Sequence, residues 1–514
     1  MRFNWKVPLS ILVFAVCVGP TFVSYKPYAF AFDDGDYLWR SIAVSRAFWS
    51  GNRHALGLAM RGIRPPIMTM LGLPWGALVS WDAAGKCFLT LAALTALLVA
   101  FCLFLLLRVG VKPLYLAIAS VCVFAALGPY PKDTQTHFEA TGFLADSIFA
   151  WSALAAILLI PYEAATQASS TKDDVVRGIL WGMIFSLGAI TKVSFLYFIG
   201  LIIPILLVMR ARRAGLVSAF VSLTSLTICS LPVAIYWVRY GLPALKNGWA
   251  SSFGHLATFY DVPFWQFWGA TIRESPGLLL SGVFAIACIV DRIVKRRNFA
   301  WDINLLAFLI IIGYCAITLS SSNRELRYSY VGVIGPPFLI AILMSEKSRA
   351  LSRDSATIAA ALVFSCLAIA GIPTLHRADM QNIARSEVVL REAAQSNAKR
   401  VLLATDSPSL NLSLLKVAIE LSPSRPTFVA DTLAWCAANG SSIDDDFRAI
   451  DDSDLIVFQN REVLDPPFTN QRVPEYEGYT RQHFGNVSMT AVGDMRFYGR
   501  NGSVSAEPME AADP

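Results

Sequence analysis

Residues 87–107, CFLTLAALTALLVAFCLFLLL, contain no charged side chain and lie between Lys86 and Arg108. An α-helix needs about 20 mostly apolar residues to cross the hydrocarbon core of a bilayer, so this stretch predicts a membrane span. The whole chain agrees, because 55% of its 514 residues are hydrophobic and only 16% are charged, against roughly 25% in a soluble domain. The sequence therefore predicts an α-helical polytopic membrane protein and excludes a soluble globular one.

About eleven transmembrane helices are expected. Basic residues such as Arg210, Arg212 and Arg213 gather in alternate short loops, which the positive-inside rule assigns to the cytoplasm. With eleven spans, the N-terminus is then cytoplasmic and the C-terminal part of the chain is extracytoplasmic. The predicted spans are 7–25, 85–107, 113–129, 140–160, 175–190, 193–209, 214–239, 276–294, 303–320, 328–344 and 355–372.

Charge divides the chain into two parts. Residues 373–514 carry 13 basic and 20 acidic side chains, a net charge of −7, whereas residues 1–372 have a net charge of +13. The basic residues of the first part stand in short clusters between apolar segments, which favours a role in membrane topology over nucleic-acid binding. We predict a transmembrane domain over 1–372, with an outer loop at 26–84, and a small soluble domain over 373–514.

The C-terminal domain has an α/β pattern. Short apolar runs at 401–404, 427–430 and 455–458 predict strands, and a helical pattern at 410–421 separates the first two. Residues 479–498 predict a closing hairpin that turns at Gly485-Asn486 or at Gly493-Asp494. This domain contains no glycine-rich phosphate loop and no metal-binding cysteine and histidine spacing, and the cysteines of the chain imply no disulfide framework.

An acidic motif follows the first span directly, at residues 32–37, FDDGDY. Asp33, Asp34 and Asp36 place three carboxylates within four residues, and the mutual repulsion of such groups suits a general base or a cation ligand. The alternative is a solvated acidic turn in which Asp36 caps an amphipathic interfacial helix over residues 36–50.

Other polar residues stand out because charge is scarce in this part of the chain. Arg64, before Pro65-Pro66, could hold a phosphate, or could simply snorkel at the lipid interface. His137, Glu139 and Asp146 lie where the fourth span begins. A charge inside a span usually faces a cavity or a partner, so Asp146 predicts either a site or a structural ion pair.

Lys192 and Arg327, like Arg64, lie on the predicted outer side, against the positive-inside bias. Lys192 belongs to Thr191-Lys192 between two apolar segments, and Arg327 precedes Tyr328 at the start of the tenth span. An anionic ligand at the membrane surface would explain both positions.

Taken in order, these motifs resemble those of the GT-C superfamily of membrane glycosyltransferases, particularly the branch similar to bacterial protein O-mannosyltransferases and to the lipid A aminoarabinose transferase. The resemblance covers roughly residues 1–345. Asp34 stands where the family often has Glu, Asp36 is additional, and Arg64 replaces the Lys of some relatives. The matching motifs are Asp33-Asp34-Gly35-Asp36-Tyr37, Arg64-Pro65-Pro66, Glu139 with Asp146, Thr191-Lys192 and Arg327-Tyr328.

The resemblance implies an inverting transfer of a hexosyl or pentosyl group from a polyprenyl-phosphate donor to an acceptor hydroxyl at the outer face of a bacterial inner membrane. The acceptor could be a lipid, a glycan or a protein. Asp33 or its neighbour Asp34 would be the general base. This pair could also hold a divalent cation, and the resemblance implies no other cofactor. The resemblance implies donor-phosphate binding by Arg64, Lys192, Arg327 and Tyr328, and acceptor or sugar contacts by Asp36, Tyr37, His137, Glu139 and Asp146.

Two other classes of function fit parts of the pattern. A transporter or flippase for polyprenyl-linked sugars would also need outer cations and aromatic loops, but such proteins often have repeated halves, and the sequence has no internal repeat. A non-catalytic membrane scaffold that binds partners through the C-terminal domain would leave the clustering of polar residues on one side unexplained.

Overall fold

A computed structural model of the chain forms two compact units. The first unit comprises Met1–Tyr25, Gly57–Met68 and Leu89–Leu375, and the second comprises Lys26–Leu56, Thr69–Phe88 and His376–Pro514. Most of the spans 7–25 and 276–294 and all of the span 355–372 lie outside the described residues, so the count of eleven stays a prediction. The structure describes residues 8–9, 11–13, 32–60, 65–78, 82–127, 145–166, 170–253, 265, 286, 290, 303–320, 330–347, 381–407, 410–422, 427–437, 440–459, 470–484, 488–492 and 494–499.

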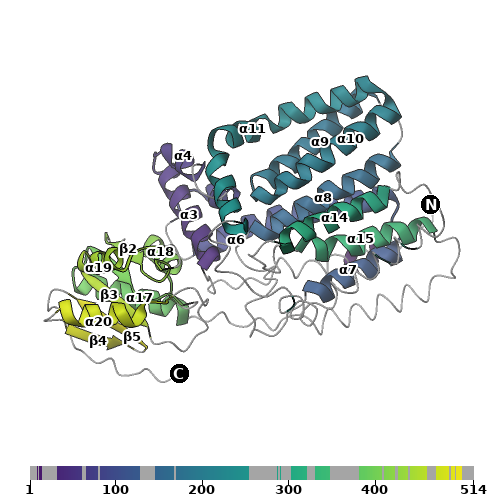
Figure 1. Ribbon diagram of the computed structural model, residues 1–514. Helices are drawn as coiled ribbons and strands as arrows, with labels where there is room; N and C mark the ends of the chain where they lie inside the picture. The colour runs from purple at the N-terminus through teal and green to yellow at the C-terminus, as the bar shows by residue number, and fades with distance from the viewer. Residues whose placement is uncertain are drawn as a thin grey trace. The chain divides into compact units, whose positions relative to one another are not determined.

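The first unit is a bundle of long apolar helices (Figure 1). Four stretches of the described residues are long and apolar enough to cross a membrane: Gly85–Val109, Ile148–Ala165, Val193–Ala214 and Leu216–Lys246. Shorter apolar helices occupy Pro113–Val123, Leu306–Thr318 and Tyr330–Ser345. This architecture confirms the predicted polytopic class. The helices are α6 (Asp82–Val109), α7 (Pro113–Leu127), α8 (Ala145–Ala165), α9 (Thr171–Ala189), η2 (Val193–Phe195), α10 (Leu196–Ala214), α11 (Leu216–Phe253), α14 (Ile303–Ser320) and α15 (Tyr330–Lys347).

Helix α8 lies at the centre of the bundle, with α9 and α10 on one side and α14 and α15 on the other (Figure 1). Every side chain from 148 to 160 is buried, as expected of a helix that is apolar on all faces. Helix α11 instead exposes Leu216, Phe220 and Val238. Because these side chains cover no protein, their exposure suits a helix that faces lipid.

Two glycines bring α9 and α11 close together. Gly178 and Gly182 stand four residues apart on one face of α9, the small-xxx-small spacing that lets membrane helices approach each other closely. A Cβ at Gly182 would lie 2.7 Å from Cβ of Cys229, and one at Gly178 would overlap the backbone oxygen of Ser222. The two helices therefore pack backbone to backbone along this face.

Charged side chains are buried at one end of the bundle, where α8 and α10 end and α9 and α11 begin. Glu163 accepts hydrogen bonds of 2.6 and 2.7 Å from Arg177 and lies 3.4 Å from Arg210. Arg210 also pairs with Asp174 and donates to Ser218. The sequence predicted a role for Arg210 in membrane topology. In the structure its side chain is fully buried. Its partners belong to α8, α9 and α11, so this α10 residue connects the ends of four helices.

The second unit contains a five-stranded sheet with the order β2-β1-β3-β5-β4. The strands β1, β2 and β3 are parallel, with Val401 opposite both Ala430 and Leu455, and β5 runs antiparallel to β3 and β4. This sheet confirms the small α/β domain predicted for the C-terminal part. Its elements are α17 (Gln381–Gln395), β1 (Arg400–Leu403), α18 (Leu412–Leu421), β2 (Val429–Thr432), α19 (Ile443–Asp451), β3 (Leu455–Gln459), α20 (Val473–His483), β4 (Ser488–Val492) and β5 (Met495–Gly499).

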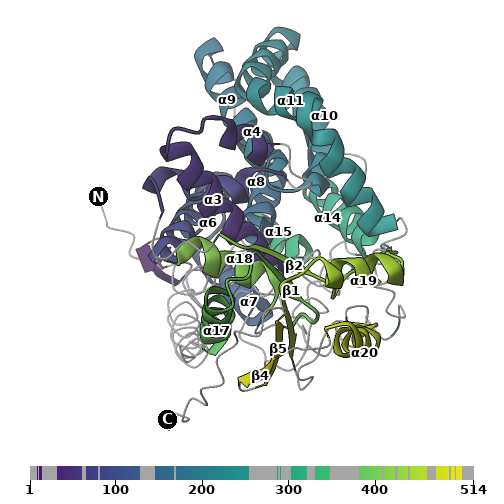
Figure 2. The same ribbon diagram turned by 90° about the vertical axis from the view of Figure 1, so that its left-hand side faces the viewer.

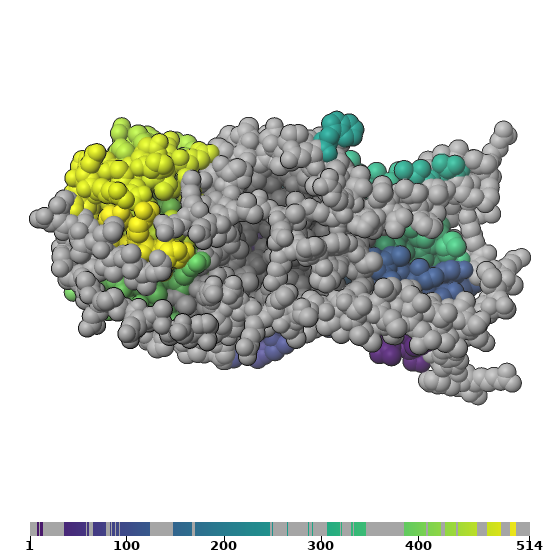
Figure 3. All heavy atoms as spheres, turned by 90° about the horizontal axis from the view of Figure 1, so that it is seen from below, coloured from purple at the N-terminus to yellow at the C-terminus, as the bar shows by residue number. Residues whose placement is uncertain are grey.

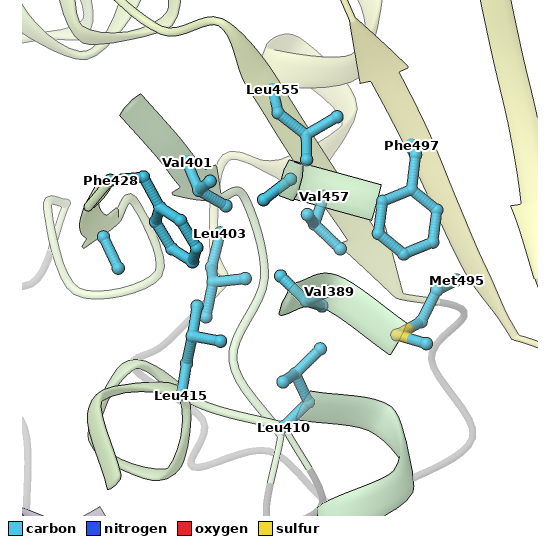
Figure 4. Close-up of a cluster of buried hydrophobic side chains, with 12 residues drawn as sticks. Val389, Val401, Leu403, Leu410, Leu415, Phe428, Leu455, Val457, Met495 and Phe497 are labelled. Atoms are coloured by element: carbon cyan, nitrogen blue, oxygen red, sulfur yellow. The ribbon is translucent and has the colours of Figure 1, made fainter. Parts of the chain in front are cut away.

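Helices cover both faces of this sheet, α17 and α18 on one face and α19 and α20 on the other (Figure 2). Val401, Leu403 and Val457 point to the α17–α18 side, where Val389 and Leu415 meet them (Figure 4). The intervening residues, such as Leu402 and Ile456, join the core under α19 and α20. This alternation is the period of two expected of strands that are buried on both faces.

The predicted closing hairpin forms later in the chain than expected. Residues 479–483 belong to α20 rather than to a strand, because Tyr476 and Thr480 stand four residues apart and are both buried. Val492 of β4 pairs with Met495 of β5, so the two strands are joined after Val492 and not at Gly485-Asn486. Residues of this C-terminal part form the yellow surface in Figure 3.

Helix α3 (Phe32–Trp49) belongs to the second unit, together with the segment 69–88 that contains the short helix η1 (Leu73–Trp75). The contacts between residues thus place the acidic motif in the same unit as the C-terminal sheet. The charge pattern of the sequence instead divides the chain at residue 373, which would place the motif with the transmembrane domain. Two further short helices, α4 (His54–Met60) and α5 (Ile67–Met70), follow α3 in the chain.

Candidate functional site

The acidic motif forms the beginning of helix α3. The helix starts at Phe32, four residues before the expected start, so Asp33 and Asp34 lie in its first turn, where the helix dipole favours negative charge. Their side chains lie outside the described residues. The helix ends at Trp49, and Gly51 follows with φ +95°, the left-handed conformation common just after helix ends.

Asp36 is engaged by neighbours on its own helix. Its carboxylate accepts hydrogen bonds from Nε1 of Trp39 at 3.1 Å and from Nε of Arg40 at 3.0 Å. The side chain of Asp36 is 21% exposed. Tyr37, beside it, is half-buried. Contacts of Asp36 and Tyr37 with a sugar or an acceptor stay a prediction.

Part of the apolar face of α3 is covered by protein. Leu38 and Ile42 are completely buried, whereas Trp49 at the end of the helix is exposed. An interfacial position for this helix stays a prediction. The buried hydroxyl of Ser45 donates to the backbone oxygens of Gly72 and Gly76, and the amide of Gly72 donates to Oγ of Ser41 at 2.8 Å. The loop around residues 72–76 therefore holds α3 in a fixed orientation.

A second group of predicted residues comes together in the first unit. The amide of Ile67, directly after Arg64-Pro65-Pro66, donates a hydrogen bond of 3.2 Å to the backbone oxygen of Ile190, directly before Thr191-Lys192. Two motifs that are more than a hundred residues apart in the sequence are thus adjacent in the structure. Arg64 itself lies outside the described residues.

Lys192 stands at the sharp turn between α9 and α10. Its amide donates to the oxygen of Gly188, and Oγ1 of Thr191 donates to the oxygen of Leu187 at 2.6 Å. The ammonium nitrogen of Lys192 lies 5.6 Å from the ring centre of Phe149, within the range of a cation–π contact. Since η2 and α10 follow at once, the turn fixes the backbone that carries this cation.

The N-terminal part of α8 adjoins the same place. Phe149 lies three residues after Asp146, on the same side of the helix, and packs against Phe195, Phe198 and Tyr314. The backbone of Asp146 is helical, while its side chain lies outside the described residues. This aromatic group was missed in the sequence, where only its spacing from Asp146 could have indicated it.

The remaining predicted motif, Arg327-Tyr328, follows helix α14 in the sequence. Tyr314, two turns before the end of α14, contacts Phe149 and Phe198 near the starts of α8 and α10. The last turns of α14 therefore run toward Lys192. The predicted site residues His137, Glu139, Arg327 and Tyr328 lie outside the described residues.

The Lys192 end and the buried charges around Glu163 lie at opposite ends of the bundle. Helix α9 connects Asp174 of the buried charges to the turn at Lys192, a rise of about 27 Å at 1.5 Å per residue. That length matches the hydrocarbon thickness of a bilayer, about 30 Å. Lys192 and the pair of Arg210 with Asp174 thus lie about one hydrocarbon thickness apart along the bundle.

Within the part of the chain that the structure describes, no group of three or more His, Cys, Asp or Glu side chains could hold a metal ion. The side chains of Asp33 and Asp34, which the sequence named for a divalent cation, lie outside the described residues. A divalent cation at that pair therefore stays a prediction.

The sequence matches no family model and no curated protein. Among solved structures, ArnT from Cupriavidus metallidurans bound to undecaprenyl phosphate matches with a TM-score of 0.56 and 13% identity, over 99% of this chain and 100% of that chain. The apo state of the same protein matches with a TM-score of 0.51 and 12% identity, over 97% and 99%. At this identity the likeness shows the fold alone, and it confirms the predicted resemblance to the fold of ArnT.

Proposed function

We propose that this chain, which has the fold of the GT-C glycosyltransferase ArnT, transfers a sugar from a polyprenyl-phosphate donor to an acceptor hydroxyl at the extracytoplasmic face of the membrane. The main support for this proposal is that two motifs, Pro65-Pro66 and Thr191-Lys192, lie next to each other beside the start of α8. The solved ArnT structure, bound to undecaprenyl phosphate, supports a lipid phosphate as the ligand.

The position of Lys192 suits a phosphate that arrives within the bilayer. The cation is held at a tight turn near the end of an apolar bundle, where low dielectric strengthens its attraction for an anion. Arg64 precedes the Pro-Pro segment that bonds to this turn, and Arg327 and Tyr328 follow α14, whose last turns run toward it. We assign all four residues to the donor phosphate.

The reaction would proceed by direct displacement. The acceptor hydroxyl oxygen forms a bond to the anomeric carbon as the bond from that carbon to the phosphate oxygen breaks, and the configuration inverts. The hydroxyl proton passes to a carboxylate, for which we propose Asp33, with Asp34 orienting it. The electron pair leaves with the polyprenyl phosphate, whose charge Arg64, Lys192 and Arg327 would stabilise. Asp36, Tyr37, His137, Glu139 and Asp146 are proposed to contact the sugar or the acceptor.

The positions of the basic side chains support an extracytoplasmic site. Arg210, Arg212 and Arg213 lie at the end of the bundle opposite Lys192, and the positive-inside rule places such a cluster in the cytoplasm. A reporter fused to the C-terminus should be active only outside the cytoplasm. Cytoplasmic reporter activity would refute the predicted topology and, with it, an outer site.

Binding of undecaprenyl phosphate to the purified full-length chain in lipid nanodiscs tests the donor site. Lys192→Ala should weaken binding at least about tenfold, because a hydrogen bond to a charged group contributes about 1.5–3 kcal/mol. Lys172→Ala is the matched control, since Lys172 is exposed at the opposite end of α9. Equal affinity of the wild type and both variants would contradict the assignment of Lys192.

Transfer from a labelled polyprenyl-phosphate sugar tests the catalytic assignment. Asp33→Asn should abolish transfer while undecaprenyl phosphate still binds, because the proposed base does not hold the phosphate. Mass analysis of envelope glycolipids and glycoproteins, with and without the chain, would identify the sugar and the acceptor. Movement of the lipid-linked sugar across the membrane without transfer would favour the flippase alternative.

A further inference from the structure

Helices α3 and α18 of the second unit lie side by side (Figures 1 and 2). They run in the same direction, because Gly35 meets Ser413 at the start of both helices and Arg46 meets Glu420 near the ends of both. The helix that begins with the acidic motif is thus held along the whole length of α18. This contact joins residues almost four hundred positions apart.

The closest approach is at Gly35, in the middle of the acidic motif. A Cβ at this position would lie 3.0 Å from Cβ of Ser413 and 3.3 Å from the backbone nitrogen of Leu414. Gly35 is buried, and the first distance is shorter than an ordinary carbon–carbon contact of about 3.5–4.0 Å. An alanine here would therefore require the first turns of α3 and α18 to move apart by a few tenths of an ångström.

The next contact links α18 to a carboxylate of the motif itself. The ammonium nitrogen of Lys416 lies 5.3 Å from the ring centre of Trp39, a cation–π distance. Nε1 of the same indole donates to Asp36. The side chain of Trp39 therefore contacts α18 with its ring and orients Asp36 with its edge.

Arg46 fixes the far end of the contact. Its Nη1 donates to Oε2 of Glu420 at 2.6 Å, its Nη2 donates to the backbone oxygen of Glu420, and its Nε donates to the oxygen of Leu78 at 3.0 Å. The side chains of Arg46 and Glu420 are only 17% and 26% exposed. A guanidinium shared in this way restricts both helices, since its donors lie in one rigid plane.

Helix α18 is itself a rigid support. Leu414, Leu415, Ala418 and Leu421 are buried, and Leu415 belongs to the core under one face of the sheet (Figure 4). The helix begins at a cap, where Oδ1 of Asn411 accepts from the amide of Leu414 at 2.9 Å. Any movement of α18 would therefore disturb the packing of the C-terminal domain.

We propose that the C-terminal domain positions the acidic motif for catalysis through the contact between α3 and α18, with Gly35, Trp39 and Arg46 as positioning residues. The inference rests on the proposed glycosyl transfer and gives the C-terminal domain a role in it. The carboxylate that acts as the general base must be held in a fixed position, because a displacement of about 1 Å can reduce the rate about a hundredfold.

The glycine contact provides the first test, with the full-length protein in nanodiscs. Gly35→Ala should lower kcat for sugar transfer about tenfold or more, while the affinity for undecaprenyl phosphate stays within about twofold. Ser413→Gly removes the nearest carbon and should restore part of the lost kcat in the double variant. Gly57→Ala is the matched control, because nothing lies within 4 Å of a Cβ at Gly57. A merely structural defect would lower the thermal midpoint without the split between kcat and binding.

The ion pair provides the second test. Arg46→Gln and Glu420→Gln should each lower kcat, and the double variant should lose less than the product of the two single losses. Arg448→Gln and Asp445→Asn are control substitutions in an exposed pair of the same domain and should leave kcat unchanged. Wild-type kcat in Gly35→Ala, or no rescue by Ser413→Gly, would overturn the positioning inference alone. A wild-type chain that transfers no sugar would instead refute the proposed function.

Discussion

The buried charges around Glu163 allow one prediction to be developed in full. Glu163 and Arg210 have no exposed surface, and Arg177 and Asp174 are 8% and 4% exposed. Two carboxylates thus face two guanidinium groups away from water. Glu163→Gln removes one negative charge and leaves both arginines beside the single carboxylate of Asp174, so a buried charge loses its compensation. Breaking a buried ion pair in this way costs about 3–5 kcal/mol.

Equilibrium unfolding of the full-length protein in mixed detergent micelles would measure this cost. Asp445→Asn, in an exposed ion pair on α19, is the control and should cause little change. Glu163→Gln combined with Arg177→Gln removes one charge of each sign, so the double variant should lose less stability than Glu163→Gln alone. A loss of less than about 1 kcal/mol in Glu163→Gln, or additive losses in the double variant, would refute the reasoning.

Three further changes should have defined effects. Gly182→Leu should destabilise the chain strongly, because α9 and α11 leave no room for a side chain there. Gly200→Ala should be tolerated, because nothing lies within 4 Å of a Cβ at that position. The thermal midpoints of the two variants would test this difference. Gly188→Ala would press on the ring of Phe195 beside Lys192 and should weaken binding of undecaprenyl phosphate, measured as for Lys192→Ala. Burial raises the pKa of Glu392, so the folded state binds this proton more tightly than the unfolded state and stability should fall as pH rises through the raised pKa. Glu392→Gln should therefore raise the thermal midpoint at pH 8 but not at pH 4, and equal midpoints for wild type and variant at both values would contradict this.

The sequence predicted the membrane class and the C-terminal strands because these depend on local pattern. Apolar runs long enough to cross a bilayer predict helices wherever they occur, and the runs at 401–404 and 455–458 alternate between the two faces of the sheet. The end of the C-terminal domain was harder to predict. Residues 479–483 are polar and aromatic, as an edge strand could also be, and only the burial of Tyr476 and Thr480 makes them part of a helix.

The sequence also named Lys192 and Arg64 as candidates, because cations on the expected outer side needed an explanation. It could not show that their motifs meet through Ile67 and Ile190, since a backbone hydrogen bond leaves no pattern in the side chains. Phe149 was missed for a similar reason. An aromatic residue in an apolar helix is ordinary until a cation is found 5.6 Å from its ring.

By itself, the sequence determined that this chain is a polytopic membrane protein with an acidic α/β domain, because hydrophobicity and charge act locally and add along the chain. Only the tertiary structure decided that Arg210 is buried between two carboxylates and that α3 rests on α18 through Gly35, Trp39 and Arg46. These contacts join residues far apart in the chain. Which residues become partners depends on which helix surfaces pack together, and local sequence preferences do not encode that packing.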